Sequence, residues 1–533
     1  MPIREFSSGG PRRRIVCVGD LPSDSEQAAF TDRGYQLLPF SPTLLTEPAE
    51  LAALDSVVFS QRAKAPTQVV RHLEQYVPRL LDNDCRVYVR VATSKVLQNH
   101  GRAIVVGALR RLRLPVGELT PQERASIPPQ EREREGLPLA PFVYVCEPGY
   151  TWPRIAQLIS TNPAGRSPNT GLRIDVVDSR GRQIVLGETR ELLLKRAFDN
   201  CEAVHLRQMQ DGLSGVVVFR ALAEHAGGLE GSGWPVLYFV KIGDRQKITD
   251  EYEKYQGHAL LYIPFNLGPR LTLERCGLGA HEAIIVGDFV EQAEALKNCA
   301  SGGRAAHALS NLFNRTLRAW HNAAEGQNSR TVFECLAERY PTEIPDEREP
   351  LIRAYGGTHS LQYLRSVLEQ VKAKPVLIGT IHGDLNASNV LIRGGDAIVI
   401  DFEQLTEGMP LVYDAASVEA GLFVDGFAED PREPLAILES IAPLYQSKQL
   451  FDWLKPCHPK DGSSWFYECV RLVRLQAQQF QLAPDQYATA LAFAYIKKAC
   501  NKHVFCDRRD ELRALGYVFA ERIVELINPK GNQ

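Results

Sequence analysis

The chain has 533 residues, of which 44% are hydrophobic and 23% are charged, the composition of an ordinary globular protein. Its 61 Lys and Arg and 64 Asp and Glu give a formal charge of -3, so the basic excess of a large nucleic-acid-binding surface is absent. No run approaches the roughly 18 consecutive apolar residues of a membrane-spanning helix, and a chain of this length predicts about three folding units.

The N-terminal residues and the cysteines indicate the cellular compartment in which the protein resides. Arg12-Arg13-Arg14 is not followed by the apolar segment of a secretory signal. The 11 cysteines are odd in number and scattered, which argues against a disulfide framework. We therefore expect a cytoplasmic protein that binds neither nucleic acid nor membrane.

Short apolar runs alternate with helix-like segments between residues 12 and 117. Strands separated by helices pair in parallel, so this region predicts a doubly wound α/β domain of flavodoxin-like or receiver-like type. Its third strand ends in Phe59-Ser60, where a receiver would need a phosphoacceptor Asp. We therefore expect a domain that senses a ligand or docks a partner protein, and is not phosphorylated. The expected strands are 15–18, 35–40, 56–59, 86–91 and 103–109, and the expected helices are 23–34 and 66–81.

Two less regular segments follow this domain. Residues 118–140 are polar, charged and proline-bearing, and are expected to form a linker. Residues 141–200 are expected to form a connecting α/β segment. It begins with a strand and a helix between residues 142 and 160 and continues through a loop at 162–171 rich in Pro, Gly, Ser and Asn.

The next region begins with two predicted strands, Leu206–Met209 and Val216–Arg220. The loop between them contains Ser214 and Gly215, and its Gly-Leu-Ser-Gly sequence suits either a common hairpin turn or a loop that covers phosphate groups. A third apolar strand, Val236–Ile242, carries a single lysine near its end.

That lysine, Lys241, has two candidate roles. The simpler interpretation is a surface residue whose stem covers apolar neighbours. A helix predicted over 248–260 follows, and Glu251 lies near its buried stripe, four residues before Tyr255. Glu251 is therefore the favoured ionic partner of Lys241, with a merely solvated glutamate as the alternative.

The most informative segment runs from Ile381 to Glu403. Two short apolar strands, 390–392 and 397–400, predict a hairpin that brings Asp384, Asn389 and Asp401 to one rim. Two carboxylates and an amide oxygen suit Mg²⁺, which prefers hard oxygen ligands. Phosphoryl transfer uses this chemistry, because one carboxylate takes the proton of the attacking hydroxyl while other oxygens hold the metal at the nucleotide phosphates.

His382-Gly383-Asp384 with Asn389, followed by Ile400-Asp401-Phe402-Glu403, has the H-x-D-x-x-x-x-N spacing of a kinase catalytic loop. It resembles the aminoglycoside phosphotransferase and choline kinase-like family. The resemblance implies an α+β bilobal protein-kinase-like domain, with an N-lobe at 201–290 and a mainly helical C-lobe at 291–530. It also implies the following roles: Asp384 as catalytic base, His382 as the residue that orients the catalytic loop, Asn389 and Asp401 as Mg²⁺ ligands, and Ser214, Gly215, Lys241, Glu251 and Asp288 around ATP.

The details of the motif favour an atypical kinase. Gly383 stands where signalling protein kinases carry Arg, and no A-P-E signature follows Asp401. We expect an ATP- and Mg²⁺-dependent phosphotransferase, regulated by the N-terminal domain, that acts on a hydroxyl of a small-molecule or protein acceptor. The alternative is a nucleotide-binding pseudokinase that serves as a signalling or interaction scaffold. The sparse glycine loop favours the scaffold, whereas the joint presence of Lys241, Asp384, Asn389 and Asp401 favours activity.

Overall fold

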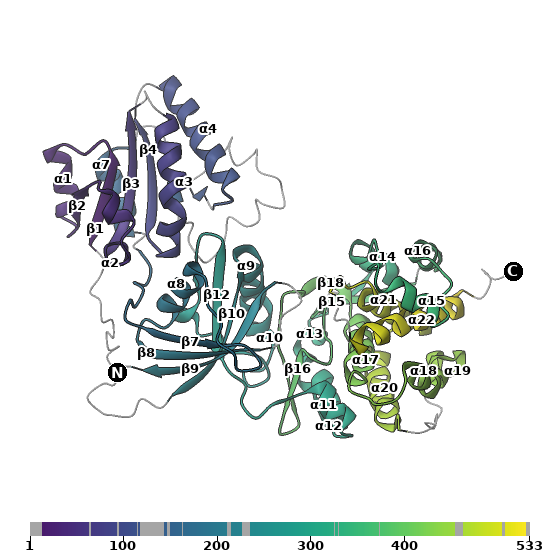
Figure 1. Cartoon of the computed structure of the whole chain (residues 1–533). Helices are drawn as coiled ribbons and strands as arrows, with labels where there is room; N and C mark the ends of the chain where they lie inside the picture. The colour runs from purple at the N-terminus through teal and green to yellow at the C-terminus, as the bar shows by residue number, and fades with distance from the viewer. Residues whose placement is uncertain are drawn as a thin grey trace. The chain divides into compact units, whose positions relative to one another are not determined.

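The computed structural model divides the chain into two compact units (Figure 1). Unit 1 comprises residues 1–253 and 270–289, and unit 2 comprises residues 254–269 and 290–533. The structure describes residues 13–62, 66–92, 95–114, 116–117, 143–146, 150–161, 164–209, 215–225, 235–324, 326–328, 330–371, 374–452, 462–503 and 507–528.

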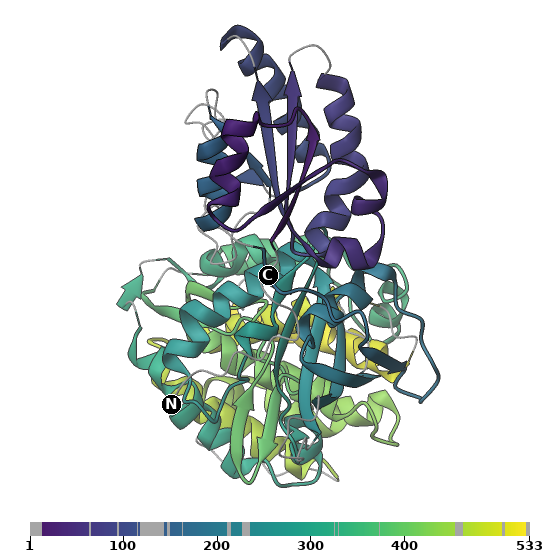
Figure 2. The ribbon, with the colours of Figure 1, turned by 90° about the vertical axis from the view of Figure 1, so that its left-hand side faces the viewer.

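Unit 1 begins with a six-stranded sheet in the order β2-β1-β3-β4-β6-β5, in which every neighbouring pair is parallel. Helices cover both faces of this sheet, as Figure 2 shows. Its strands are β1 Arg14–Gly19, β2 Gln36–Pro39, β3 Leu54–Arg62, β4 Arg86–Ala92, β5 Val116–Gly117 and β6 Val143–Val145. Its helices are α1 Asp24–Thr31, α2 Pro48–Ala52, α3 Pro66–Asp82, α4 Lys95–Arg111 and α7 Trp152–Thr161.

Apolar residues on both faces of each strand explain the two layers of helices. On β3, Val57 and Phe59 belong to the cluster under α3 and α4, whereas Val58 belongs to the cluster under α1 and α7. Successive side chains of a strand point to opposite faces, so a continuous apolar run indicates burial on both sides. The expected parallel α/β sheet is therefore present.

Two expectations for this region were wrong. Residues 103–109 form part of helix α4 instead of a strand, because a short apolar run without alternation suits a buried helix equally well. The sheet also does not end at residue 117, since β6 pairs with β4 and β5, and Trp152 of α7 packs against Phe30 of α1. The domain therefore extends to Thr161. The expected linker at 118–140 lies outside the described residues.

The second sheet of unit 1 has the order β11-β12-β10-β9-β8-β7 and is antiparallel except for the pair β7–β8. Helix α8 packs on one face, where Leu194 joins Val240 and Val286 in one core, whereas Ile248 of α9 belongs to the core cluster that contains Ile285. The elements are β7 Arg173–Val177, α8 Glu188–Ala197, β8 Cys201–Gln208, β9 Val217–His225, β10 Val236–Asp244, α9 Arg245–Lys254, β11 Gly277–Leu278 and β12 Glu282–Asp288.

Buried polar contacts join the two sheets of unit 1. The carboxylate of Asp82, at the end of α3, accepts the N–H of Ala280 at 2.7 Å. Arg196 of α8 donates to the carbonyls of Asp82 and Leu278 and forms an ion pair with Asp84 at 3.0 Å. Because a buried charge is stable only when paired, these contacts fix the α/β domain against the turn between β11 and β12.

Unit 2 contains two small sheets, β13-β16-β17 and β14-β15-β18, and is otherwise mainly helical, as expected. Its strands are β13 Glu294–Ala295, β14 Gly326–Asn328, β15 Val376–Ile381, β16 Val390–Arg393, β17 Asp396–Val399 and β18 Thr406–Pro410. Its helices are α10 Leu260–Tyr262, α11 Leu296–Ser301, α12 Ala306–Asn311, α13 Arg318–Asn322, α14 Val332–Leu336, α15 Glu349–Ala354, α16 Leu361–Glu369, α17 Val412–Gly426, α18 Pro434–Ile441, α19 Ser447–Phe451, α20 Ser464–Ala477, α21 Pro484–Ala499 and α22 Arg508–Ile527, with a π-helical turn at Tyr255–Ala259 directly after α9.

A buried ionic network holds the helical core of unit 2 together. Glu419 of α17 accepts hydrogen bonds from Arg474 of α20 at 2.7 and 2.9 Å and from the hydroxyl of Tyr487 of α21 at 2.7 Å. The side chains of Glu419 and Arg474 are 0% and 1% exposed. Since each charge is paired and hydrogen-bonded, the network ties three helices together.

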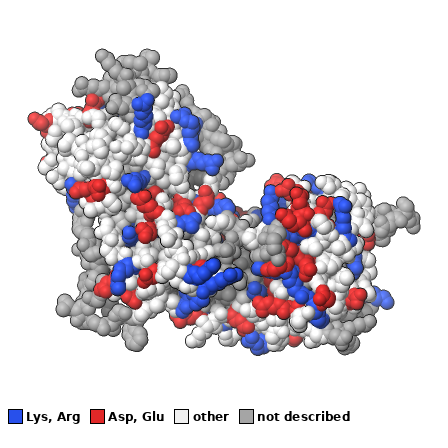
Figure 3. All heavy atoms as spheres, in the orientation of Figure 1, with Lys and Arg blue, Asp and Glu red and all other residues white. Residues whose placement is uncertain are grey.

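The surface of the described residues agrees with the near-neutral charge of the chain. Acidic and basic side chains are interspersed on the face shown in Figure 3. Within the described ranges, none of the helices combines the length and the apolar character that crossing a bilayer requires. The nine cysteines that can be described are all free thiols.

Candidate active site

Residues 382–389 form a loop between β15 and β16, and a buried carboxylate anchors its start. Asp414, on the first turn of α17, is 1% exposed and accepts the N–H groups of His382 at 2.8 Å and Gly383 at 3.0 Å. Burial raises the pKa of Asp414, although these two donors and His382 favour its charged form. Asp414 therefore fixes the backbone immediately before Asp384.

Gly383 is required by both its conformation and its surroundings. Its φ is +76°, a left-handed value that favours glycine. A Cβ atom at this position would lie 2.3 Å from the carbonyl oxygen of Gln404 and 2.9 Å from Nη1 of Arg339. The glycine therefore allows two segments of unit 2 to approach the loop next to Asp384.

Two asparagines hold Asp384. Nδ2 of Asn389 donates to the carbonyl of Asp384 at 2.9 Å and lies 3.4 Å from its Oδ2, and Nδ2 of Asn386 donates to the same Oδ2 at 3.1 Å. Oδ1 of Asn386 accepts the N–H groups of Ser388 and Asn389, which closes the turn. These bonds leave Oδ1 of Asn389 as the atom that could bind a metal ion. The sequence analysis did not identify Asn386, although Asn often forms a turn in which its side chain accepts the N–H of the residue two positions later, here Ser388.

His382 is fully buried and connects the loop to the residue before Asp401. Its Nε2 donates to the carbonyl of Ile400 at 3.0 Å, and its ring packs against Phe402 with centroids 5.6 Å apart. A buried imidazole that donates to a backbone carbonyl positions the chain. These contacts favour the orienting role expected for His382 over direct proton transfer.

Asp401 follows β17 with a φ of +68°, in the left-handed region that Asp tolerates better than most residues. The preceding Ile400 donates its N–H to the carbonyl of Asn389 at 3.0 Å, so the hairpin brings the backbones of the two proposed metal ligands together. The next residue, Phe402, is 2% exposed and packs against Tyr255 and Trp320 as well as His382. The hairpin therefore gathers His382, Asp384, Asn389 and Asp401 into one region of unit 2.

In unit 1, the expected ion pair between Lys241 and Glu251 is present. Nζ of Lys241, on β10, lies 2.5 Å from Oε2 of Glu251, on α9, and the two residues are only 8% and 9% exposed. The sheet register places Lys241 opposite Ile285 of β12 and Val218 of β9. Lys241 is therefore a buried, paired residue and does not extend along the surface.

The other predicted nucleotide-binding residues are more peripheral. Gly215 is exposed and has a φ of +78°, and Ser214 lies outside the described residues. Asp288 is the last residue of β12. Its side chain is exposed, and its N–H already donates to the carbonyl of Arg270 at 2.8 Å. This N–H is therefore not available to an adenine base.

Two cations that the sequence analysis missed lie beside the loop of unit 2. Nζ of Lys497, on α21, donates to the carbonyl of Gly383 at 3.0 Å. Burial lowers the pKa of Lys497, while Asp384 and Asp414 oppose this effect. Arg339 donates to the carbonyl of Gln404 and to the hydroxyl of Thr406. Lys497 is 114 residues away from Gly383 in the chain, so no local pattern indicates the contact.

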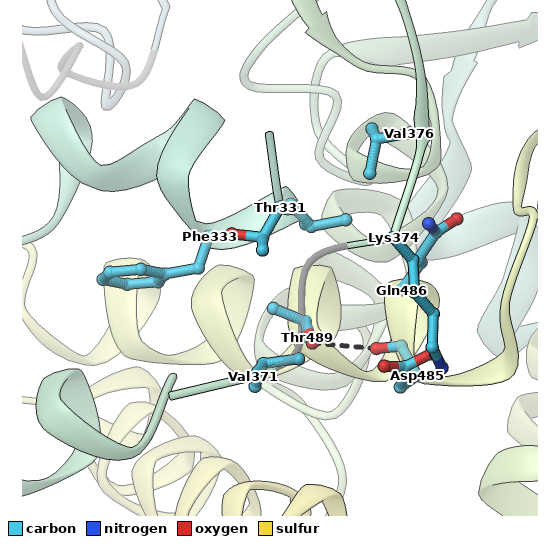
Figure 4. A pocket seen from close by; sticks show the side chains of 9 residues that line it. Thr331, Phe333, Val371, Lys374, Val376, Asp485, Gln486 and Thr489 are labelled. Atoms are coloured by element: carbon cyan, nitrogen blue, oxygen red, sulfur yellow. Dashed lines mark hydrogen bonds and ion pairs between the residues drawn. The ribbon is translucent and has the colours of Figure 1, made fainter. Parts of the chain in front are cut away.

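A separate small pocket in unit 2 is not a candidate site. Figure 4 shows it near the start of β15, where Thr489 donates to the carbonyl of Asp485 at 2.8 Å. Its volume of about 10 Å³ suits roughly one water molecule. The lining residues are Thr331, Val332, Phe333, Val371, Lys374, Val376, Asp485, Gln486 and Thr489.

Comparisons with known proteins give the following similarities. A family model described as ternary complex associated domain 9 matches residues 351–497. Among solved structures, aminoglycoside phosphotransferase APH(3'')-Id from Streptomyces rimosus is 18% identical and covers 54% of this chain and 99% of its own, with a TM-score of 0.28. Choline kinase LicA from Streptococcus pneumoniae is 16% identical and covers 57% and 89%, with a TM-score of 0.28. Amicoumacin kinase hAmiN, solved with AMP-PNP and Ca²⁺, is 12% identical and covers 61% and 88%, with a TM-score of 0.34. No curated protein sequence matches the chain significantly.

Proposed function

We propose that the chain is an ATP- and Mg²⁺-dependent phosphotransferase that transfers the γ-phosphate of ATP to a hydroxyl group. The observation that carries the proposal is the loop of unit 2, in which Asp384 is held by Asn389 beside the strand end that bears Asp401. The buried pair of Lys241 and Glu251 in unit 1 supports it, because a kinase needs a lysine fixed for the phosphates.

Asp384 acts as the base. Its Oδ2 accepts hydrogen bonds from Asn386 and Asn389, so its Oδ1 is the atom assigned to the hydroxyl of the acceptor. Asp414 and His382 act on Asp384 through the backbone, since they fix the residues on either side of the loop without supplying a proton. This arrangement positions a carboxylate rigidly, which is the main protein contribution in phosphoryl transfer.

The donor set fits Mg²⁺. One carboxylate, Asp401, and one amide oxygen, Asn389, are the sparse hard ligands with which proteins hold this ion beside phosphate oxygens. When bound, the ion neutralises phosphate charge.

Residues of unit 1 are assigned to ATP. Lys241, oriented by Glu251, holds the α- and β-phosphates, and Ser214 and Gly215 are assigned to the same phosphates. Asp288 marks the segment assigned to adenine, where a group other than its own N–H makes the contact, because that N–H is occupied by Arg270.

The N-terminal α/β domain, with its parallel sheet in the order β2-β1-β3-β4-β6-β5, is assigned the regulation of this site. Asp82 accepts the N–H of Ala280, in the turn between β11 and β12. Arg245, the first residue of α9, donates to two carbonyls of this turn: its backbone N–H donates to His281 and its side chain donates to Gly279. These contacts therefore connect the α/β domain to α9, the helix that bears Glu251. We assign the regulatory ligand to a cavity of about 180 Å³ in unit 1. Its lining residues are Asp84, Gly165, Arg166, Leu193, Arg196, Ala197, Glu274, Arg275, Cys276, Gly277 and Ile284.

A pseudokinase scaffold is the second candidate function. The family description that matches residues 351–497 concerns association with a complex, and the occupied N–H of Asp288 weakens the expected adenine contact. The scaffold would bind ATP without transferring phosphate.

The experiment that separates the two functions is phosphate transfer from labelled ATP with Mg²⁺ and a panel of hydroxyl acceptors. An active kinase labels at least one acceptor, and Asp384→Asn abolishes the labelling while the matched variant Asp485→Asn, on α21, retains it. ATP binding without labelling of any acceptor above the Asp384→Asn background supports the scaffold.

A further inference from the structure

Two cationic side chains converge on the residue before Asp384. Lys497 reaches the carbonyl of Gly383 from α21, at 3.0 Å. Arg339 ends a short 3-10 helix, Ala337–Arg339, and its Nη1 lies 2.9 Å from the point that a Cβ of Gly383 would occupy. Both residues belong to unit 2, as does Asp384.

Arg339 has a donor that no described acceptor fills. Arg339 uses Nη2 for Gln404 and Thr406, whereas its Nη1 is buried and finds no acceptor in the described part of the chain. Arg and Lys side chains donate hydrogen bonds and accept none, so this set can be satisfied only by an acceptor atom. A buried donor without a partner is destabilising, and an incoming oxygen would remove that cost.

The neighbouring carboxylates do not neutralise these donors directly. Burial lowers the pKa of Lys497, and the nearby Asp384 and Asp414 offset this effect only in part. Asp414 is already occupied by two backbone N–H groups. Within the described ranges, neither Arg339 nor Lys497 forms an ion pair with a carboxylate. The region therefore combines a proposed base with a guanidinium nitrogen that has no described acceptor and with an ammonium that donates to Gly383.

We propose that Arg339 and Lys497 form the anion-binding part of the acceptor site, so that the acceptor carries a carboxylate or phosphate group close to its reactive hydroxyl. This inference rests on the proposed function. The planar guanidinium and the ammonium suit two oxygens of one oxyanion. The nucleotide is assigned to Lys241, Asn389 and Asp401. Lys497 contacts the chain at Gly383, which lies on the other side of Asp384 in sequence from Asn389 and Asp401.

The reaction then balances as follows. The acceptor hydroxyl gives its proton to Oδ1 of Asp384, and its oxygen forms the bond to the γ-phosphorus of ATP. The bond between that phosphorus and the β,γ-bridging oxygen breaks, and ADP leaves with the electron pair. Asp384 afterwards releases the proton to water. Arg339 and Lys497 hold the anionic group of the acceptor throughout.

The experiment compares small hydroxyl compounds that differ in charge. Full-length protein with ADP and Mg²⁺ is titrated by calorimetry with D-glycerate, with 3-phosphoglycerate, with neutral glycerol and with cationic choline, and the four compounds are also tested for phosphate transfer from ATP. The variants are Arg339→Gln and Lys497→Gln, with Arg353→Gln and Lys374→Gln as controls elsewhere in unit 2. Thermal unfolding and ATP affinity verify that each variant is folded.

We expect D-glycerate or 3-phosphoglycerate to bind at least about 10-fold more tightly than glycerol and choline. Both anions carry a carboxylate, so tighter binding of 3-phosphoglycerate than of D-glycerate indicates a site for phosphate, and equal or weaker binding indicates a site for carboxylate. Arg339→Gln and Lys497→Gln should each weaken this binding by about 10- to 100-fold, as expected for a lost charge-assisted hydrogen bond, while both controls retain it. Anions that bind no better than glycerol, or that bind equally to all variants, overturn the inference. If the wild type binds no ATP, the proposed function is contradicted instead, because ATP binding does not depend on Arg339 or Lys497.

Discussion

The substitution Asp414→Asn tests whether the loop before Asp384 must be held by a buried carboxylate. Asp414 accepts the N–H groups of His382 and Gly383 at 2.8 and 3.0 Å and is 1% exposed. Asparagine has nearly the same shape but offers one oxygen and one NH₂ group. One of the two backbone N–H groups therefore loses its acceptor and faces a donor.

The magnitude follows from these two bonds. A buried N–H left without an acceptor costs about 1–3 kcal/mol, which corresponds to roughly 5- to 150-fold in the population of the productive loop. Asp414 touches none of the residues assigned to ATP, so we expect the rate of phosphate transfer to fall by about this factor while ATP affinity stays unchanged.

The assay is single-turnover ATP consumption together with calorimetric ATP titration, on wild type, Asp414→Asn and Asp425→Asn. The last variant makes the same chemical change on the same helix, α17, and should retain the wild-type rate. A rate for Asp414→Asn equal to that of wild type, or a parallel loss of ATP affinity, would refute the reasoning.

Three further predictions concern stability and regulation. Burial lowers the pKa of His321 to about 4 from the usual 6.5, so the unfolded chain binds the proton more tightly than the folded one. The stability that His321 contributes is therefore present above pH 6.5 and is lost as the pH falls to about 4, by about 3 kcal/mol at most. Unfolding curves should show a larger loss of stability between pH 7 and pH 4 for wild type than for His321→Gln. Glu419→Gln leaves the guanidinium of Arg474 buried without its counter-charge and should lower the free energy of unfolding by about 3–5 kcal/mol in denaturant titrations, with a loss below 1 kcal/mol as the contrary result. Asp82→Ala leaves the N–H of Ala280 unsatisfied and should raise amide exchange at the start of α9 by on the order of 10-fold, whereas unchanged exchange there would disconnect the α/β domain from that helix.

The sequence predicts those parts of the site that depend on short spacings. The loop and hairpin from His382 to Asp401 are local, so strand pairing and turn chemistry bring Asp384, Asn389 and Asp401 together. The pairing of Lys241 with Glu251 was also predictable, because a strand followed directly by a helix leaves few partners for a buried lysine. The roles of these residues in catalysis stay predictions.

The residues that escaped prediction act over long distances in the chain. Arg339 and Lys497 reach Gly383 from elements far away in sequence, and nothing in their own segments distinguishes them from surface cations. Asp414 looks like any acidic residue at the start of a helix, and only the fold shows that it is buried under the loop.

Errors in the fold have similar causes. The apolar run at 103–109 carries no alternation that separates a buried strand from a buried helix, and packing in the first sheet decides in favour of α4. The strand β6 is only three residues long and follows a long charged segment, so its place between β4 and β5 could not be read from its own sequence.

The measurement that tests the central claim most directly is single-turnover phosphate transfer, with ATP affinity measured in parallel, for wild type and Asp384→Ala. If Asp384 is the base, the variant binds ATP with nearly wild-type affinity but transfers phosphate about 10²- to 10⁴-fold more slowly, because a general base acts mainly in the transition state. Wild-type protein that binds ATP yet never transfers phosphate faster than Asp384→Ala, with any acceptor of the panel, would contradict the account.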